Sequence, residues 1–325
     1  MKKILLSVVC LVVVGMQSVY AQIAVATLHH IGQVTTFSSS RLSDALESAV
    51  DGDTIYLSNG VFSSDILIDK RITLIGVGME TIVSGSIVIA IPDTARLSSQ
   101  VLQNVYVQNN IYIDKPVTGL IISQTRFFEF FFRAITDSSL IDRCVCAGTM
   151  HLSSDIKDLQ VVGSKIQQVC NDCSEASAAT FYNCNIRKLF NHSTWGNDIY
   201  RGTCRATYIN CIIWMLEYFT FSGVSVNCLI GPSSDTNNYY DQGTSINSWG
   251  IESITFDDEM NVIEPDDSVL AEYKGTDGKP IGCMGGSVPF SLVPPTPKVT
   301  DHKIEVDNKE RKINVTLIIG NNKMQ

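Results

Sequence analysis

The chain has 325 residues, of which 45% are hydrophobic and only 18% are charged, so it is long enough to bury a large core. Its formal net charge of −9 argues against nucleic acid or an anionic membrane surface as its partner, because both repel an acidic protein. The same charge disfavours a broad binding surface for polyanionic sugars, although a local basic groove would override it.

The first 21 residues predict a secretory signal peptide. Lys2 and Lys3 form a basic start, an apolar run follows over 4–15, and the residues up to Ala21 resemble a small-residue cleavage site. This run is short for a membrane span, and no later stretch is long and apolar enough for one. We therefore expect an exported protein of the periplasm, cell surface or extracellular space, with no membrane insertion after cleavage. Nine of the ten cysteines would remain, and an odd number leaves at least one thiol unpaired.

A short helix is predicted soon after the signal peptide, and it would cover one end of the core. Asp44 and Glu47 have the spacing of a capping box, and Gly52 is placed to end the helix. Strands then follow over 53–57, 66–68 and 72–75. The apolar residues that share one face of the helix are Leu42, Ala45, Leu46, Ala49 and Val50.

Further along the chain, one short pattern returns about every twenty residues, which is typical of a solenoid. Each copy has a small residue followed two places later by an apolar one, and residues two apart in a strand share a face. The pattern therefore predicts a narrow core lined by rows of like side chains. The small residues are separated by 20, 19, 20, 20, 27 and 17 positions and fall at Val105, Thr125, Cys144, Ser164, Cys184, Cys211 and Cys228.

The residue before each small position predicts a tight corner between strands. Four of these residues are Asn, which tolerates left-handed backbone and can hydrogen-bond along the stack. Gly163 suits the same role, whereas Gln124 and Arg143 fit it less well. We expect the cysteines of the small column to be mostly reduced, because turns about 4.8 Å apart are too widely spaced for a relaxed disulfide.

These features predict an all-β fold, a single-stranded right-handed parallel β-helix of about ten coils with an N-terminal α-helical cap and a C-terminal β-hairpin extension. The expected organisation is a signal peptide over 1–21, the β-helix over 22–288, a Pro-rich linker over 289–298 and the hairpin over 299–325.

Two segments carry a specific resemblance. Residues 43–78 combine a capping helix, a Gly-Asp-Thr-Ile strand, a glycine turn and a Leu-Ile-Gly strand. This order resembles the opening of right-handed parallel β-helix proteins of the pectin-lyase-like superfamily. Residues 268–286 resemble the terminal coil of many exported bacterial members.

The resemblance implies the kinds of active site to look for. Enzymes of this superfamily act on acidic polysaccharides in a groove along the solenoid, the lyases with calcium and a basic residue and the hydrolases with paired carboxylates. Such groups should recur in adjacent coils, and the sequence shows no recognisable catalytic motif. Asp137 and Asp158 are the best acid pair, and we interpret them as solvated turn residues in preference to catalytic ones.

The sequence contains one cysteine pair that could suggest a metal site, but other roles for this pair are favoured. Cys170 and Cys173 have a metal-like spacing, with His151, His192 and Glu175 elsewhere. A single such pair in an exported chain favours a disulfide or unpaired core and turn thiols over zinc. We therefore expect no metal and no cofactor, apart from calcium if the protein is a lyase.

Two loops are the candidate ligand-binding elements. The step of 27 residues between Cys184 and Cys211 contains an insertion, and insertions in a solenoid become loops on one face. Aromatic side chains in such loops can stack on sugar rings, or they can simply pin the loops to the barrel. The candidate ligand-binding residues of this insertion and of a second loop over 233–250 are Trp195, Asn197, Asp198, Tyr200, Arg201, Tyr239, Tyr240 and Trp249.

A dense aromatic cluster lies at Phe127, Phe128 and 130–132. At least one of these rings must face outward from a strand, because successive side chains alternate. We expect a neighbouring loop or the terminal hairpin to cover it.

Three functional hypotheses remain open. The first is a non-catalytic exported protein that binds or scaffolds polysaccharide or another glycan at the cell envelope. The second is a polysaccharide lyase or glycoside hydrolase that acts on acidic polysaccharide. The third is a structural or adhesin-like solenoid that contacts an envelope protein.

Overall fold

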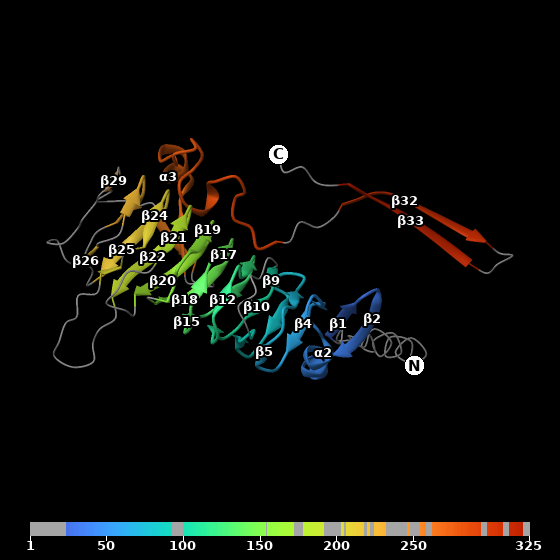
Figure 1. Ribbon diagram of the computed structural model, residues 1–325. Coiled ribbons are helices and arrows are strands. Elements are labelled where there is room, and N and C mark those ends of the chain that lie inside the picture. Colours follow the sequence, from blue (N-terminus) through green and yellow to red (C-terminus); the bar gives the residue numbers. More distant parts are fainter. Residues whose placement is uncertain are drawn as a thin grey trace, which may run out of the picture.

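The computed structural model shows a parallel β-solenoid in which the polypeptide winds into a tube (Figure 1). The all-β fold and its short N-terminal helix are therefore confirmed. About seven turns are regular, fewer than the ten expected. The structure describes residues 24–92, 100–153, 155–171, 178–191, 203–204, 206–217, 220–221, 224–231, 246–247, 254–257, 262–293, 298–307 and 312–320.

The first long sheet forms one wall of the tube. Its parallel strands are joined at one edge by an antiparallel hairpin of β1 (Val25–His30) and β2 (Gln33–Ser38), which covers the first turn. The parallel strands are, in order, β3 (Thr54–Leu57), β6 (Thr73–Ile75), β9 (Gln100–Gln103), β13 (Ile121–Ser123), β17 (Ser139–Asp142), β19 (Leu159–Val162), β21 (Ala179–Tyr182), β24 (Thr207–Ile209) and β27 (Val224–Val226).

The second long sheet forms the opposite wall and contains more strands, 14 against 11. Its main run of parallel strands is β4 (Gly60–Phe62), β7 (Thr81–Val83), β10 (Tyr106–Val107), β14 (Arg126–Phe127), β18 (Val145–Leu152), β20 (Lys165–Asn171), β22 (Asn185–Asn191), β25 (Ile212–Glu217), β28 (Leu229–Ile230) and β29 (Ile246–Asn247). In the early turns the wall continues past a bend as a second set of short strands, which joins the long strand β18. This set is β5 (Ile66–Ile68), β8 (Ile87–Ile89), β11 (Ile111–Ile113) and β15 (Phe130–Phe132).

Smaller elements complete the described part. The helical pieces are η1 (Ser39–Arg41), α2 (Leu42–Ser48), α3 (Asp267–Glu272) and η2 (Gly282–Met284). None of the helices in the described ranges is long and apolar enough to cross a membrane. The paired short strands are β12 (Val117–Thr118) with β16 (Thr136–Asp137), β23 (Thr203–Cys204) with β26 (Thr220–Phe221), β30 (Ile254–Asp257) with β31 (Val262–Pro265), and β32 (Lys298–Asp307) with β33 (Lys312–Gly320).

The predicted C-terminal hairpin is present as β32 and β33, which pair with each other. In Figure 1 it extends away from the solenoid and does not lie over the aromatic cluster. Phe131 faces outward and is half-buried, and Phe128 is 50% exposed. The expected cover over this cluster is therefore not found among the described residues.

The corner between the two walls has the same backbone conformation in every repeat. The residues before the small positions all have left-handed φ angles between 47° and 55°, including Gln124 and Arg143, which we expected to fit less well. A left-handed conformation costs a residue other than Gly or Asn about 1–2 kcal/mol. The geometry of the turn therefore overrides local preference at Gln124 and Arg143, while Asn or Gly avoids most of this cost at the other corners.

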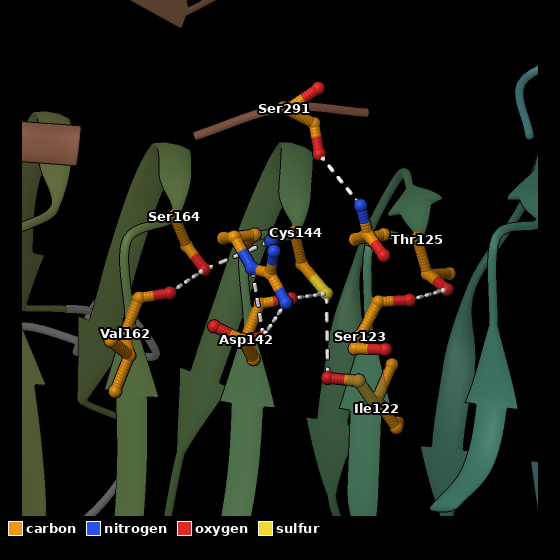
Figure 2. A network of polar contacts seen from close by, with 10 residues as sticks. Ile122, Ser123, Thr125, Asp142, Cys144, Val162, Ser164 and Ser291 are labelled. Carbon is orange, nitrogen blue, oxygen red and sulfur yellow. Dashed lines mark hydrogen bonds and ion pairs between the residues drawn. The ribbon is translucent and has the colours of Figure 1, made fainter. Parts of the chain in front are cut away.

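Apart from Val105, the small residue after each corner forms hydrogen bonds through its side chain as well as fitting the narrow interior. Ser164 donates its hydroxyl to the carbonyl of Val162 at 2.9 Å and accepts the backbone N–H of Cys144 at 3.0 Å (Figure 2). Cys211 repeats both roles, because its thiol donates to the Ile209 carbonyl at 3.4 Å and accepts the Cys184 N–H at 3.4 Å. The left-handed corner turns this N–H away from the strand ladder, and the side chain of the next turn satisfies it.

The cysteines of the repeat form the expected interior column. Cys184, Cys211 and Cys228 are each 0% exposed, and their thiols interact from one turn to the next. They and Cys144 are free thiols, as expected for turns spaced too widely for a disulfide.

Replacement of Cys211 tests the hydrogen-bonding role of the column. Cys211→Val keeps an apolar side chain of similar size but removes the acceptor for the buried Cys184 N–H. We expect a loss of about 1–3 kcal/mol in the free energy of unfolding, measured by urea denaturation. Cys211→Ser restores the acceptor and should retain more stability than the valine variant. Equal or higher stability of the valine variant would show that the column needs only small apolar side chains.

The buried thiols also predict the behaviour of the fold at alkaline pH. Burial raises the pKa of Cys144 and Cys283 from 9.0 to about 12, and burial raises that of Cys146 as well. Because an unfolded thiol ionises first, the stabilisation is complete below pH 9.0 and is lost as the pH rises toward 12. The unfolding midpoint in urea should therefore fall steadily above pH 9.0. A midpoint that stays constant between pH 9 and 11 would contradict this.

Candidate ligand-binding surface

The outer face of the second sheet carries two parallel rows of side chains, one on each side of the bend. The row next to the left-handed corner is partly covered by the segment 262–293, which we call the strap. The second row is open along part of its length and is the candidate ligand-binding surface. In register along the strands, the covered row holds Tyr106, Arg126, Val145, Lys165, Asn185, Ile212 and Leu229.

The strap runs along the outside of the tube toward the N-terminal turns, and Figure 1 shows it in orange beyond α3. At one end Asn210 binds it through both amide atoms, accepting from the Thr276 N–H at 2.9 Å and donating to the Thr276 hydroxyl at 3.1 Å. At the other end Gln124 donates to the carbonyl of Ser291 at 3.2 Å (Figure 2). This segment, whose sequence resembles a terminal coil, thus spans several turns of the solenoid.

A small apolar cluster holds the strap in place. Ile212 and Leu229 point out of the tube and are nevertheless 1% exposed, because strap residues lie over them. The strap contributes Ile263, Val269 and Ile281 to this cluster. The strap therefore removes Ile212 and Leu229 from contact with a ligand.

The open row is a ladder of mostly apolar and aromatic side chains, which we call the stripe. Leu67 is 52% exposed, and the next four members are half-buried, as expected for outward positions on a sheet. The members of the stripe, each in register with the next, are Leu67, Val88, Tyr112, Phe131, His151 and Cys170. The same backbone position continues to Phe190 and Glu217.

The rings of the stripe stack on one another. The Tyr112 and Phe131 centroids are 5.1 Å apart with planes at 15°, and those of Phe131 and His151 are 4.2 Å apart with planes at 10°. Arg133 lies over Tyr112 at 3.9 Å from the ring centroid and pairs with Asp114. Such stacks and cation–π contacts fix the rings, so the stripe presents a preorganised surface.

Polar groups flank the rings on both sides of the bend. Glu129 Oε1 lies 3.9 Å from His151 Nε2, and the guanidinium of Arg126 lies 4.6 Å from the Tyr106 ring centroid. Phe128, at the bend itself, is 50% exposed. Together these groups supply an apolar platform, hydrogen-bond donors and one carboxylate, a combination suited to binding a hydroxyl-rich ligand.

A shallow cleft of about 210 Å³ lies at the N-terminal end of the stripe. Leu67 belongs both to this cleft and to the stripe, so the two surfaces are continuous. Three carboxylates line the cleft, and Lys70 donates to backbone carbonyls of α2. The lining residues are Ser43, Leu46, Glu47, Asp65, Leu67, Asp69 and Lys70.

The insertion predicted from the sequence leaves the solenoid at the other end of the stripe. Strand β22 ends at Asn191, one residue after the stripe position of Phe190, and the insertion starts there. All eight predicted ligand-binding residues lie outside the described residues, namely Trp195, Asn197, Asp198, Tyr200, Arg201, Tyr239, Tyr240 and Trp249. The structure does place Asn191, the residue from which the insertion starts, next to the strand position that continues the stripe.

The two candidate catalytic acids are not part of the stripe. Asp137 ends β16 in the third, smaller sheet, and its carboxylate accepts a hydrogen bond from Ser138 at 3.2 Å. Asp158 is exposed in the next turn, where its backbone carbonyl accepts the N–H of Ser139. Both acids therefore sit at the corner opposite the left-handed one.

The described residues contain no group of three or more His, Cys, Asp or Glu side chains placed to hold a metal ion. Of the predicted metal-like pair, Cys170 is buried in the stripe, and Cys173 lies outside the described residues.

The stripe was missed in the sequence, although a signal for it exists. Tyr112, Phe131, His151, Cys170, Phe190 and Glu217 each fall six or seven positions after the small residue of their repeat. The pattern of the small position and its apolar neighbour two places later does not include this third row.

The chain matches no protein-family model, no curated protein and no solved structure.

Removal of the Asn210 side chain tests how the strap is held. Asn210→Ala deletes both hydrogen bonds to Thr276 and should make the segment 262–293 more sensitive to limited proteolysis, about tenfold in rate for a loss of about 1.4 kcal/mol. Asn104→Ala is the matched control, because Asn104 has the same left-handed φ of 54° but makes no hydrogen bond to the strap among the described residues. Similar cleavage rates for the two variants would contradict this role.

Proposed function

We propose that this chain is an exported, non-catalytic β-solenoid of the pectin-lyase-like type that binds carbohydrate at the cell envelope. The single observation that supports this most is the stripe, a preorganised ladder of rings with polar groups on both sides. Sugar rings have apolar faces and many hydroxyls, so they match a surface that offers both aromatic carbon and hydrogen-bonding groups.

The geometry favours an extended ligand. Successive turns of the solenoid repeat about every 4.8 Å, and the stripe crosses the turns in a straight register. A chain molecule lying along the stripe would meet a similar set of groups at each turn, from the cleft near α2 to the base of the insertion. Because the stacked rings cover one another's faces, the ligand contacts ring edges and the exposed ring of Phe128.

One observation supports the enzymatic alternative. Glu129 and His151 form a carboxylate–imidazole pair on the stripe, with oxygen and nitrogen 3.9 Å apart. A polysaccharide lyase or glycoside hydrolase needs a group that accepts a proton and one that supplies it, and this pair contains both types. We rank it second because no equivalent acid recurs in the neighbouring described turns.

A screen against a panel of polysaccharides tests the binding proposal and the enzymatic alternative, because it monitors both binding and product release. The protein without residues 1–21 should bind at least one neutral or weakly charged polymer and release no product. Phe128→Ala should weaken that binding about tenfold, or ~1.4 kcal/mol, because the exposed ring is removed. Tyr56→Ala is the matched control, since Tyr56 is 43% exposed on the first sheet, away from the stripe.

The possible outcomes separate the hypotheses. Product release that is abolished by Glu129→Gln would replace the binding proposal with the enzymatic one. The absence of binding to any polymer, or an equal effect of the Phe128 and Tyr56 variants, would remove the stripe as a glycan site and leave a structural role.

A further inference from the structure

A buried lysine and a buried asparagine lie side by side beneath the strap. Lys165 on β20 and Asn185 on β22 are partners in the parallel ladder, so their Cα atoms are about 4.8 Å apart and both side chains leave the same face of the sheet. Lys165 is 5% exposed and Asn185 is 0% exposed. A lysine is rarely buried so deeply, and here its nearest neighbour in the row is an amide.

The strap supplies the third polar group of this cluster. The carboxylate of Glu264, on β31, contacts Lys165 Nζ directly. The ring of Phe290 lies over the same nitrogen, 4.5 Å from it to the ring centroid. The amine is therefore held between a carboxylate and an aromatic ring in a position that water hardly reaches.

The amide of Asn185 is fixed and polarised by two strap backbone groups. Its Oδ1 accepts the N–H of Cys283 at 3.0 Å, and its Nδ2 donates to the carbonyl of Ile263 at 3.3 Å. The N–H of Cys283 thus draws electron density from the amide carbon. It would also stabilise an oxygen that gains negative charge during attack on that carbon.

We propose that Lys165 and Asn185 form an intramolecular amide bond that links two adjacent turns of the solenoid. Glu264 takes a proton from the Lys165 ammonium, which leaves a neutral amine. The amine nitrogen attacks Cγ of Asn185, the Nζ–Cγ bond forms and the Cγ–Nδ2 bond breaks. Glu264 passes this proton to the departing nitrogen and accepts the surplus second proton from Nζ. Ammonia leaves and carries that second proton away as ammonium, so the step is balanced without any oxidant or cofactor.

The fold supplies what this reaction requires. The ladder register places the two residues side by side on one face of the sheet, which replaces a bimolecular encounter with an intramolecular one. Glu264 acts as the proton carrier, and burial under Phe290 limits competition from water. The product would join β20 to β22 covalently, which suits an exported fibre-like fold that is exposed to proteases or mechanical load.

Peptide mapping of the full-length chain tests the proposal. Trypsin separates 158–165 from 166–187 when Lys165 carries a free amine. We expect instead one uncut peptide, 158–187, whose mass is lower than its sequence predicts by one ammonia. A second digestion that cuts after Phe181 should leave both halves joined. The peptide map is the deciding measurement. The intact mass is ambiguous, because an N-terminal Gln22 exposed by signal cleavage would also lose one ammonia when it cyclises.

Two variants and one control assign the roles. Lys165→Arg removes the nucleophile and Glu264→Gln removes the proton carrier, so both should lack the linked peptide entirely. Asn210→Asp should keep it, since Asn210 also contacts the strap but has asparagines, Asn183 and Asn227, at the same corner of the adjacent turns. Complete cleavage after Lys165 in the unaltered chain would overturn the proposal. A link between Lys165 and Glu264 with loss of one water would overturn the assignment of Asn185.

Discussion

The left-handed corner is the constraint on which the rest of the solenoid depends. It turns the chain from the first wall to the second at the same point in each repeat, and it leaves one backbone N–H per turn without a ladder partner. An unpaired N–H in the interior costs about 1–3 kcal/mol, so each turn needs an acceptor there. The small polar residue of the next turn, such as Ser164 or Cys211, provides it.

This arrangement explains why the repeat alternates among Thr, Ser and Cys without loss of regularity. All three are small enough for the narrow interior, and each has an atom that both donates and accepts. The thiol makes longer and weaker bonds than the hydroxyl, 3.4 Å for Cys211 against 2.9 Å for Ser164, but it is more apolar. Burial keeps such thiols neutral, so the column behaves as a polar ladder inside an apolar core.

The fold could be predicted from the sequence because it rests on short-range periodicity. The corner residue, the small residue after it and the apolar residue two places later lie within four consecutive positions in every repeat. The stripe and the strap contacts could not be predicted in the same way. Tyr112, Phe131 and His151 become neighbours only through the ladder register, and Glu264 reaches Lys165 across 99 sequence positions. The strap contact is set by tertiary packing and leaves no local pattern, whereas the stripe leaves only its offset of six or seven positions from the small residue.

The strap and the stripe divide the outer face of one sheet into a covered row and an open row. Outward apolar residues are a liability on any solenoid, because a repeated row of them invites aggregation or non-specific contact. On one side of the bend the chain covers them, as at Ile212 and Leu229. On the other side it leaves Tyr112, Phe131 and His151 only half-buried, although the strap lies over part of the adjoining row. Because this row is left open while its neighbour is covered, our proposal places ligand binding on the stripe and not on the covered row.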